Sequence, residues 1–172
     1  MPNSPAASFR LYLVRHAHAA WGLPGVGDFD RPLDDLGRIE ARDIARQADL
    51  AGFVPDRLVF SPALRCRQTT AALLEVFRTV RPIEDMMLYS DGADAYVTQI
   101  RRHAPEGSLM IVGHNPMIEA LAQHLAVPGE VTAPLSAGYP TAGLLALDIA
   151  RPLPSDLAGR GQAVALITPA LT

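Results

Sequence analysis

Two histidines and two arginines of this sequence are placed where they could carry out phosphoryl transfer. Arg15 and His16 follow an apolar run over 9–14, and Arg65 and His114 each lie shortly after another apolar run. A neutral imidazole with one free ring nitrogen is a competent nucleophile toward phosphorus. The planar guanidinium group forms paired hydrogen bonds with phosphate oxygens. These residue types therefore indicate a histidine nucleophile in an arginine-lined phosphate pocket.

Nearby positive charge would support such a nucleophile before and during the reaction. Arg15 and Arg65 would disfavour the protonated imidazole and so keep His16 neutral until phosphate binds. The same groups would then hold the phosphate oxygens as charge develops, and His114 could stabilise those oxygens or donate a hydrogen bond. Each residue alone is weak evidence, because an isolated histidine is often structural and an isolated arginine is often solvated.

The elements that must position these residues alternate between strands and helices. Apolar segments rich in β-branched or aromatic residues predict strands, and helical periodicity predicts helices. Ser61 is expected to cap the second helix with Pro62 at its first position, and Asp34 or Asp35 to cap the first. The predicted strands are 9–14, 57–60, 82–88, 108–112, 143–149 and 162–167, and the predicted helices are about 35–51, 62–77, 93–103 and 116–126.

This alternation predicts an α/β fold, a three-layer α/β/α sandwich with a central, mostly parallel sheet. In such a fold, ligands bind beyond the carboxyl ends of the strands. Arg15 and His16, Ser61, and Gly113 with His114 all follow predicted strands. We therefore expect the candidate residues to meet at one edge of the sheet.

The composition fits one globular domain and excludes several classes of function. The chain has 172 residues, 49% of them hydrophobic, and a net charge of −3. We expect a single domain over 1–172 with a flexible N-terminus at 1–8, and the charge gives no basic surface for nucleic acid. The one cysteine, Cys66, cannot form an intrachain disulfide. With no secretory signal and no apolar run of about 18 residues, the sequence predicts a soluble, cytoplasmic protein without a membrane partner.

Four segments resemble the motifs of the histidine phosphatase (phosphoglycerate mutase-like) superfamily, in the family's order and over roughly the first two thirds of the chain. The resemblance implies a phosphoglycerate mutase-like fold with His16 as the phosphorylated nucleophile. It also implies that Arg15, Arg65 and His114 complete the phosphate pocket. The segments are 11–17 (LYLVRHA), Arg31-Pro32-Leu33 leading to Leu36-Gly37, 61–69 (SPALRCRQT) and 112–116 (VGHNP).

Within the superfamily, the sequence is most similar to the short SixA-type phosphohistidine phosphatases. Three features carry this resemblance: the short chain, Ala17 where many relatives have glycine, and the Arg31-Pro32-Leu33 segment. In that branch, Arg31 would be a further phosphate contact. The alternative is a surface arginine at the end of a loop.

One departure from the superfamily concerns the acid that protonates the leaving group. Many members carry a glutamate just before an aromatic-containing turn, and the matching position here is Met86. Asp85 or Glu84 could reach in from beside it, although acidic residues at a strand edge are more often solvated. The absence of the acid fits a SixA-type enzyme, because imidazole is a far weaker base than an alkoxide and leaves with less help. The same absence argues against a mutase.

Other residues admit alternatives. His18 forms a His-x-His pair with His16, which is also typical of metal-dependent hydrolases, but nothing nearby supplies a convincing ligand set. We therefore predict no metal and no cofactor, with His18 at the pocket rim or in solvent. The loop from Trp21 to Asp28 is either a mobile lip over the site or an ordinary surface loop. Cys66 is expected to pack in its helix.

The sequence thus predicts a metal-independent phosphatase that hydrolyses a phosphomonoester or phosphoramidate through phosphorylated His16. Arg15, Arg31, Arg65 and His114 are the predicted phosphate-binding residues. The expected partner is a phosphorylated protein carrying phosphohistidine, and the nearest alternative is a small phosphorylated metabolite. A catalytically decayed phosphate-binding module is the alternative from a different class.

Overall fold

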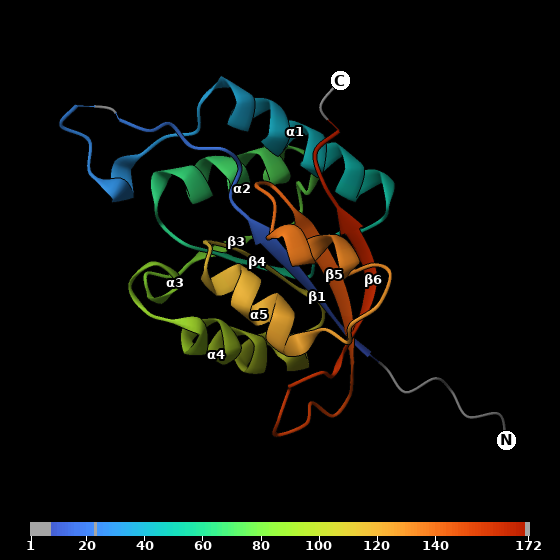
Figure 1. The fold of residues 1–172 in the computed structure, drawn as a ribbon. Helices are drawn as coiled ribbons and strands as arrows, with labels where there is room; N and C mark the ends of the chain where they lie inside the picture. Colours follow the sequence, from blue (N-terminus) through green and yellow to red (C-terminus); the bar gives the residue numbers. More distant parts are fainter. Residues whose placement is uncertain (1–7, 23, 171–172) are drawn as a thin grey trace, which may run out of the picture.

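The sequence folds into one mixed sheet, and the computed structural model describes residues 8–22 and 24–170. Four strands, β3, β2, β4 and β1, lie side by side and run parallel, and β5 and β6 join beyond β1 in antiparallel pairing. The predicted, mostly parallel sheet is therefore confirmed (Figure 1). The strands are β1 (Ser8–Arg15), β2 (Arg57–Phe60), β3 (Pro82–Glu84), β4 (Leu109–Gly113), β5 (Leu144–Ala150) and β6 (Gly161–Ile167).

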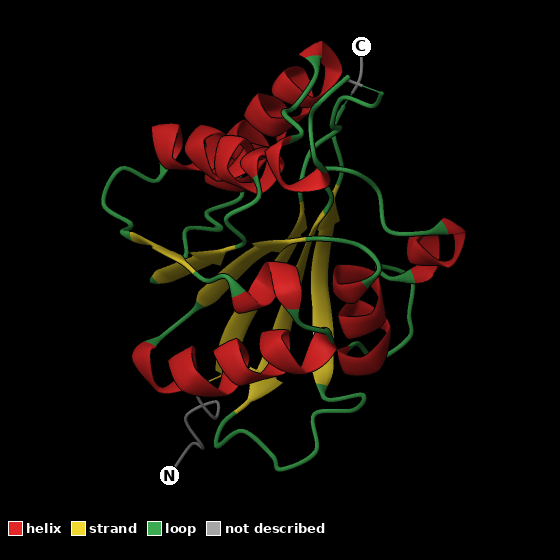
Figure 2. Ribbon diagram, turned by 90° about the vertical axis from the view of Figure 1, so that its left-hand side faces the viewer, coloured by secondary structure: helices red, strands yellow, loops and turns green. Residues whose placement is uncertain are grey.

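Helices cover both faces of the sheet, which gives the predicted three layers (Figure 2). One apolar core lies beneath α1 (Asp35–Leu50) and α2 (Leu64–Val76), and the other beneath α4 (Ala93–His103) and α5 (Met117–Leu125). All residues of β4 are buried, because a strand covered on both faces buries both of its sides. The shorter helical turns are α3 (Met87–Ser90), η1 (Asp28–Asp30), η2 (Ala104–Glu106) and η3 (Ala133–Ala137).

The carboxyl ends of β1, β2 and β4 meet at one edge of the sheet. The backbone nitrogen of His16 donates to the carbonyl oxygen of Gly113 at 3.0 Å, and that of Ser61 donates to Val112 at 3.1 Å. The three chain segments therefore leave the sheet side by side. This brings His16, Ser61 and His114 together, as expected for ligand-binding residues of such a sheet.

Two predicted elements differ from those in the structure. The second helix begins at Leu64 with Ala63 as its N-cap, not at Ser61 and Pro62. Ser61 is buried, and its hydroxyl pairs with the ring of His114 instead of capping the helix. The strand predicted over 82–88 ends at Glu84, because the chain turns into α3. The cap of α1 is Asp34, whose carboxylate accepts from the nitrogen of Gly37 at 2.8 Å.

The predicted flexible N-terminus at 1–8 falls mostly on residues 1–7, which lie outside the described residues. Ser8 is not part of such a segment, because it begins β1 and pairs with Ala150. Among the residues that the structure describes, no helix is long and apolar enough to cross a membrane. The cytoplasmic location stays a prediction. Cys66 is buried in α2, as expected.

Candidate active site

One ring nitrogen of His16 is unprotonated and faces Arg65. Its Nδ1 lies 2.8 Å from the carbonyl oxygen of Ala17. Because a carbonyl oxygen can only accept, Nδ1 carries the hydrogen and Nε2 keeps its lone pair. The Nε–H of Arg65 points at this Nε2 from 3.3 Å. The backbone just after β1 therefore sets both the tautomer and the orientation of the His16 ring.

The neutral state of His16 has a clear physical origin. Burial, together with smaller effects of His114, Arg65 and Arg15, lowers the pKa of His16 to about 3, while the hydrogen bond to Ala17 opposes the change. The two arginines act in the predicted direction. Burial, which the sequence reasoning did not consider, is nevertheless the largest cause.

Arg65, in the first turn of α2, connects the two histidines to a loop. Its Nε contacts His16, and its Nη2 lies 3.2 Å from Nδ1 of His114. The remaining donors go to Asp28, with Nη1 2.6 Å from the carbonyl oxygen and Nη2 3.0 Å from the carboxylate. The side chain is only 6% exposed. Its orientation is therefore determined by partners on every edge of the guanidinium group.

His114 is held by groups from two other elements. Its Nε2 lies 2.7 Å from the hydroxyl oxygen of Ser61. Because Nδ1 faces a donor of Arg65, Nε2 carries the hydrogen and donates to Ser61. Burial, followed by the charge of Arg65, lowers the pKa of His114 to about 4. The rings of His16 and His114 lie edge to face with centroids 5.3 Å apart.

Arg15 and Arg31 complete the positive lining. Nη1 of Arg15 donates to the carbonyl oxygen of Tyr139 at 2.6 Å. Arg31 stacks on the ring of Trp21, with 3.9 Å from its central carbon to the ring centroid, a cation–π contact. Its Nε and Nη2 each lie 3.0 Å from the same carboxylate oxygen of Asp28.

One cavity of about 460 Å³ contains all five residues that were predicted for phosphate binding and catalysis. Their individual roles in catalysis stay predictions. His18 also lines this cavity, which is one of its two predicted positions, and its Nδ1 lies 2.6 Å from the carboxylate of Asp34. The lining residues are Arg15, His16, His18, Ala19, Trp21, Asp28, Arg31, Arg65, His114, Asn115 and Thr141.

The two acidic residues considered as proton donors are engaged elsewhere. Asp85 accepts from the nitrogen of Met87 at 2.9 Å and from the side chain of Gln99, so it holds the start of α3. Glu84 lies 3.7 Å from Arg67. Neither carboxylate is part of the cavity lining given by the described residues.

Asp28 lines the cavity and is a candidate residue that the sequence did not indicate. The loop that contains it forms a wall of the cavity, because η1 packs against the guanidinium of Arg65. Nothing in the sequence indicates the pairing with Arg65, which is 37 residues away. The usable signal was local: Asp28 lies three residues before Arg31, the spacing of an ion pair on a helical turn.

The described residues contain no group of three or more histidine, cysteine, aspartate or glutamate side chains arranged to hold a metal ion. His16 and His18, the pair that suggested one, direct their Nδ1 atoms to different partners, Ala17 and Asp34. Metal independence stays a prediction.

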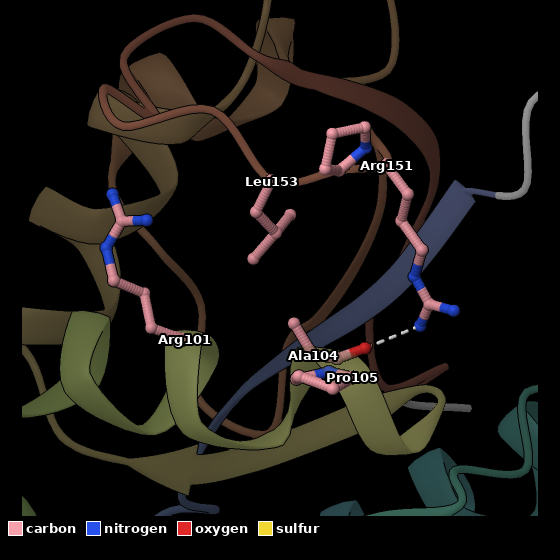
Figure 3. Close-up of a pocket in the computed structure, with 6 residues that line it drawn as sticks. Arg101, Ala104, Pro105, Arg151 and Leu153 are labelled. Atoms are coloured by element: carbon pink, nitrogen blue, oxygen red, sulfur yellow. Dashed lines mark hydrogen bonds between the residues drawn. The ribbon is translucent and has the colours of Figure 1, made fainter.

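Another cavity, of about 430 Å³, is lined by Arg101 and Arg151 (Figure 3). It adjoins Ala150, which pairs with the first residue of β1, so it sits at the opposite end of that strand from His16. Arg151 donates to the carbonyl oxygens of Ala104 at 2.7 Å and Gly107 at 3.1 Å. Arg101 likewise donates to backbone carbonyls of the connection between β5 and β6.

Comparisons with known proteins identify the family of this chain. Residues 11–89 match the histidine phosphatase superfamily (branch 1). The crystal structure of a protein assigned as the phosphohistidine phosphatase SixA from Agrobacterium tumefaciens is similar, with a TM-score of 0.81 and 36% identity over 95% of this chain and all of that chain. The chain belongs to the histidine phosphatase superfamily. The resemblance stated from its motifs is confirmed.

Other proteins are also similar to this chain. The structure of a protein assigned as SixA from Nakamurella multipartitia has a TM-score of 0.79 and 25% identity over 98% of this chain and all of that chain. An uncharacterised protein of Mycobacterium tuberculosis is 32% identical over 80% of this chain and 87% of its own. A match to a chloroplast protein of Arabidopsis thaliana, 36% identical, spans only 32% of that protein's length.

Proposed function

We propose that this histidine phosphatase is a SixA-type phosphohistidine phosphatase that acts on a phosphorylated protein through a phosphohistidine intermediate. The observation that carries the proposal is the free Nε2 of His16, which faces Arg65 inside the arginine-lined cavity. The similarity to the Agrobacterium protein assigned as SixA supports the choice of branch.

In the first step, the lone pair on Nε2 of His16 forms a bond to phosphorus, and the bond to the leaving group breaks with its electron pair. Arg15, Arg31 and Arg65 hold the phosphate oxygens as charge develops. The phosphorylated imidazole is positively charged, and the carbonyl oxygen of Ala17 stabilises it by accepting from Nδ1. In the second step, water attacks phosphorus and the electron pair of the P–N bond returns to Nε2.

This reaction requires no metal and no cofactor, because the guanidinium groups supply the positive charge that a metal would otherwise provide. The hydrogen bond from Arg65 to His16 gives way when phosphate enters. Its donor is then available to a phosphate oxygen.

A second candidate substrate is a small phosphorylated metabolite. A cavity of about 610 Å³ shares Arg15 and Asn115 with the phosphate-binding cavity and is also lined by Glu119. This space next to the nucleophile would accept the remainder of a small substrate. The same histidine mechanism would apply to it.

The function is tested by incubating the purified protein, with a chelator present, with a phosphohistidine-containing protein and with an aryl phosphate. His16→Ala is the test variant, and His124→Ala is the matched control because His124 lies exposed on α5. We expect turnover by the wild type and the control, and none by His16→Ala. When the reaction is quenched at alkaline pH, the trapped enzyme should carry the phosphoryl group on His16.

The outcomes separate the alternatives. Faster turnover of the phosphoprotein supports the proposed substrate class, and faster turnover of small phosphates favours the metabolite. Full activity in His16→Ala would overturn the mechanism. Binding of vanadate without turnover of either substrate would indicate a phosphate-binding module instead.

A further inference from the structure

Asp28 is the one carboxylate among the described residues that line the phosphate cavity. The mechanism above assigns no group to the two proton transfers that hydrolysis requires. One proton must reach the leaving group, and another must leave the attacking water. The two acids considered from the sequence are engaged at α3 and at Arg67, so Asp28 is the candidate that the geometry supplies.

The carboxylate of Asp28 is held by three side chains from different segments. Arg65 donates to one oxygen at 3.0 Å and Arg31 to the other at 3.0 Å. The hydroxyl of Tyr89, from α3, lies 3.2 Å from the oxygen that Arg65 contacts, and Tyr89 also packs edge to face on Phe29 with centroids 5.0 Å apart. Such support fixes the orientation that proton transfer requires.

Asp28 and the proposed nucleophile, His16, both contact the guanidinium group of Arg65. Nε of Arg65 contacts His16, while Nη1 contacts the backbone carbonyl of Asp28. These two nitrogens lie on different edges of the guanidinium group, so His16 and Asp28 approach Arg65 from different directions. The side chain of Asp28 is 53% exposed, so water and a leaving group can reach it.

We propose that Asp28 is the proton-transfer group of this active site, an inference that rests on the proposed phosphatase function. A proton taken up with the substrate phosphate resides on the Asp28 carboxyl. It moves to the leaving atom as the bond from phosphorus to that atom breaks. The resulting carboxylate then takes a proton from water as the water oxygen bonds to phosphorus, while the P–N electron pair returns to His16.

Phosphate binding would favour protonation of Asp28, which is the change that this role needs. Burial alone would raise the pKa of Asp28, but the hydrogen bonds and charges of Arg65 and Arg31 outweigh it and hold the pKa below its usual range. Phosphate binding would neutralise those two arginines and place negative charge beside the carboxyl. Both changes favour the protonated acid.

The test compares Asp28→Asn with Asp30→Asn, because both remove one negative charge from η1. Asparagine at 28 keeps an oxygen that can accept from Arg65, and Asp30 is exposed. The probes are aryl and alkyl phosphates whose leaving groups range from weakly to strongly basic. For each, kcat/KM is measured, and rapid alkaline quenching gives the amount of phosphorylated His16.

We expect the loss in Asp28→Asn to grow with the basicity of the leaving group, from little for an activated aryl phosphate to about 10²–10⁴-fold for an alkyl phosphate. Phosphorylated His16 should accumulate with the activated substrate, because water attack has lost its base. Asp28→Glu, which restores the ionisable group, should recover part of the loss. Asp30→Asn should behave as the wild type.

An equal loss for every leaving group would overturn the proposal and make Asp28 a positioning residue for Arg65. Unchanged rates would also overturn it. Failure of the phosphatase function itself would look different, since the wild type would then neither turn over any probe nor form phosphorylated His16. That outcome would overturn the Asp28 proposal as well.

Discussion

The phosphate cavity around His16 and the distant cavity between Arg101 and Arg151 differ in what their guanidinium groups contact. In the distant cavity, Arg101 and Arg151 donate to backbone carbonyls and join α4 and η2 to the connection between β5 and β6. In the phosphate cavity, Arg65 contacts two imidazole nitrogens, the carboxylate of Asp28 and one backbone carbonyl, that of Asp28. Backbone carbonyls are permanent partners that a ligand cannot displace without opening the fold.

This difference shows why the number of arginines around a cavity does not identify a phosphate site. Arg65 and Arg31 both contact the carboxylate of Asp28, and phosphate can replace this side-chain partner while Nη1 of Arg65 keeps its contact with the carbonyl oxygen of Asp28. A guanidinium group whose partners are exchangeable can bind a ligand. Arg101 and Arg151 instead join segments of the fold through backbone oxygens and contribute to its stability.

Replacing one arginine in each cavity by lysine gives the largest expected contrast. Arg65→Lys should lower kcat/KM by about 10²–10³-fold, because lysine cannot reproduce the several fixed donors of the guanidinium group. Arg101→Lys should leave kcat/KM within about twofold, because it alters no group near His16. Steady-state kinetics with an aryl phosphate measure both. Equal losses in the two variants would contradict the distinction between the cavities.

The next largest expected effect concerns the protonation of the histidines in the phosphate cavity. An ordinary histidine would be mostly protonated at pH 5, with about 30-fold more charged than neutral form. His16 should stay neutral there, because burial and nearby positive charge lower its pKa to about 3. The ring carbon-bound protons of His16 should keep their NMR shifts between pH 8 and pH 5. A titration midpoint near 6.5 would show that the buried environment is wrong.

The same two histidines should make folding stability depend on pH. Between about pH 6.5 and pH 4, the unfolded chain binds a proton at His114 that the folded chain does not, because burial lowers the folded pKa to about 4. The free energy of unfolding should therefore fall with decreasing pH by about 1.4 kcal/mol per pH unit for this group. Urea unfolding at pH 6.5 and pH 5 measures the slope.

His16→Asn provides the control for that slope. His16 has its own lowered pKa and contributes in the same direction, so the variant should retain only the part due to His114. Aspartates with lowered pKa values, such as Asp28, lose their contribution only below the pKa of an unfolded aspartate near 4. Stability that did not change between pH 6.5 and pH 5 would contradict the burial of both rings.

Much of this fold could be predicted from the sequence, because its buried strands are continuous apolar runs and its helices have amphipathic spacing. The start of the second helix could not be predicted, since it was expected at Ser61 and Pro62 and lies at Leu64. Serine before proline is a common cap signal, but here the side chain pairs with His114, which is 53 residues away. The predicted strand over 82–88 extends beyond the observed end at Glu84, because a short apolar run has no period long enough to distinguish strand from helix.

The candidate site could likewise be predicted only where strand ends determine the position of a residue. Arg15, His16, Arg65 and His114 follow strands, so topology alone brings them together. Asp28 lies in a loop that has no periodicity, and its position depends on contacts with Arg65 and Tyr89 that no local rule predicts. The low pKa of His16 could be predicted in direction from nearby charge. Its main cause, burial, depends on how the completed cavity packs.

The smallest expected effect concerns the distant cavity. Arg151→Lys should lower the free energy of unfolding by about 1 kcal/mol, because it removes hydrogen bonds to the carbonyls of Ala104 and Gly107 and net hydrogen-bond contributions are of that size. Its kcat/KM should equal that of the wild type, and the urea midpoint measures the loss. A variant with unchanged stability and reduced activity would reverse the assignment, because it would make this cavity functional and its backbone contacts incidental.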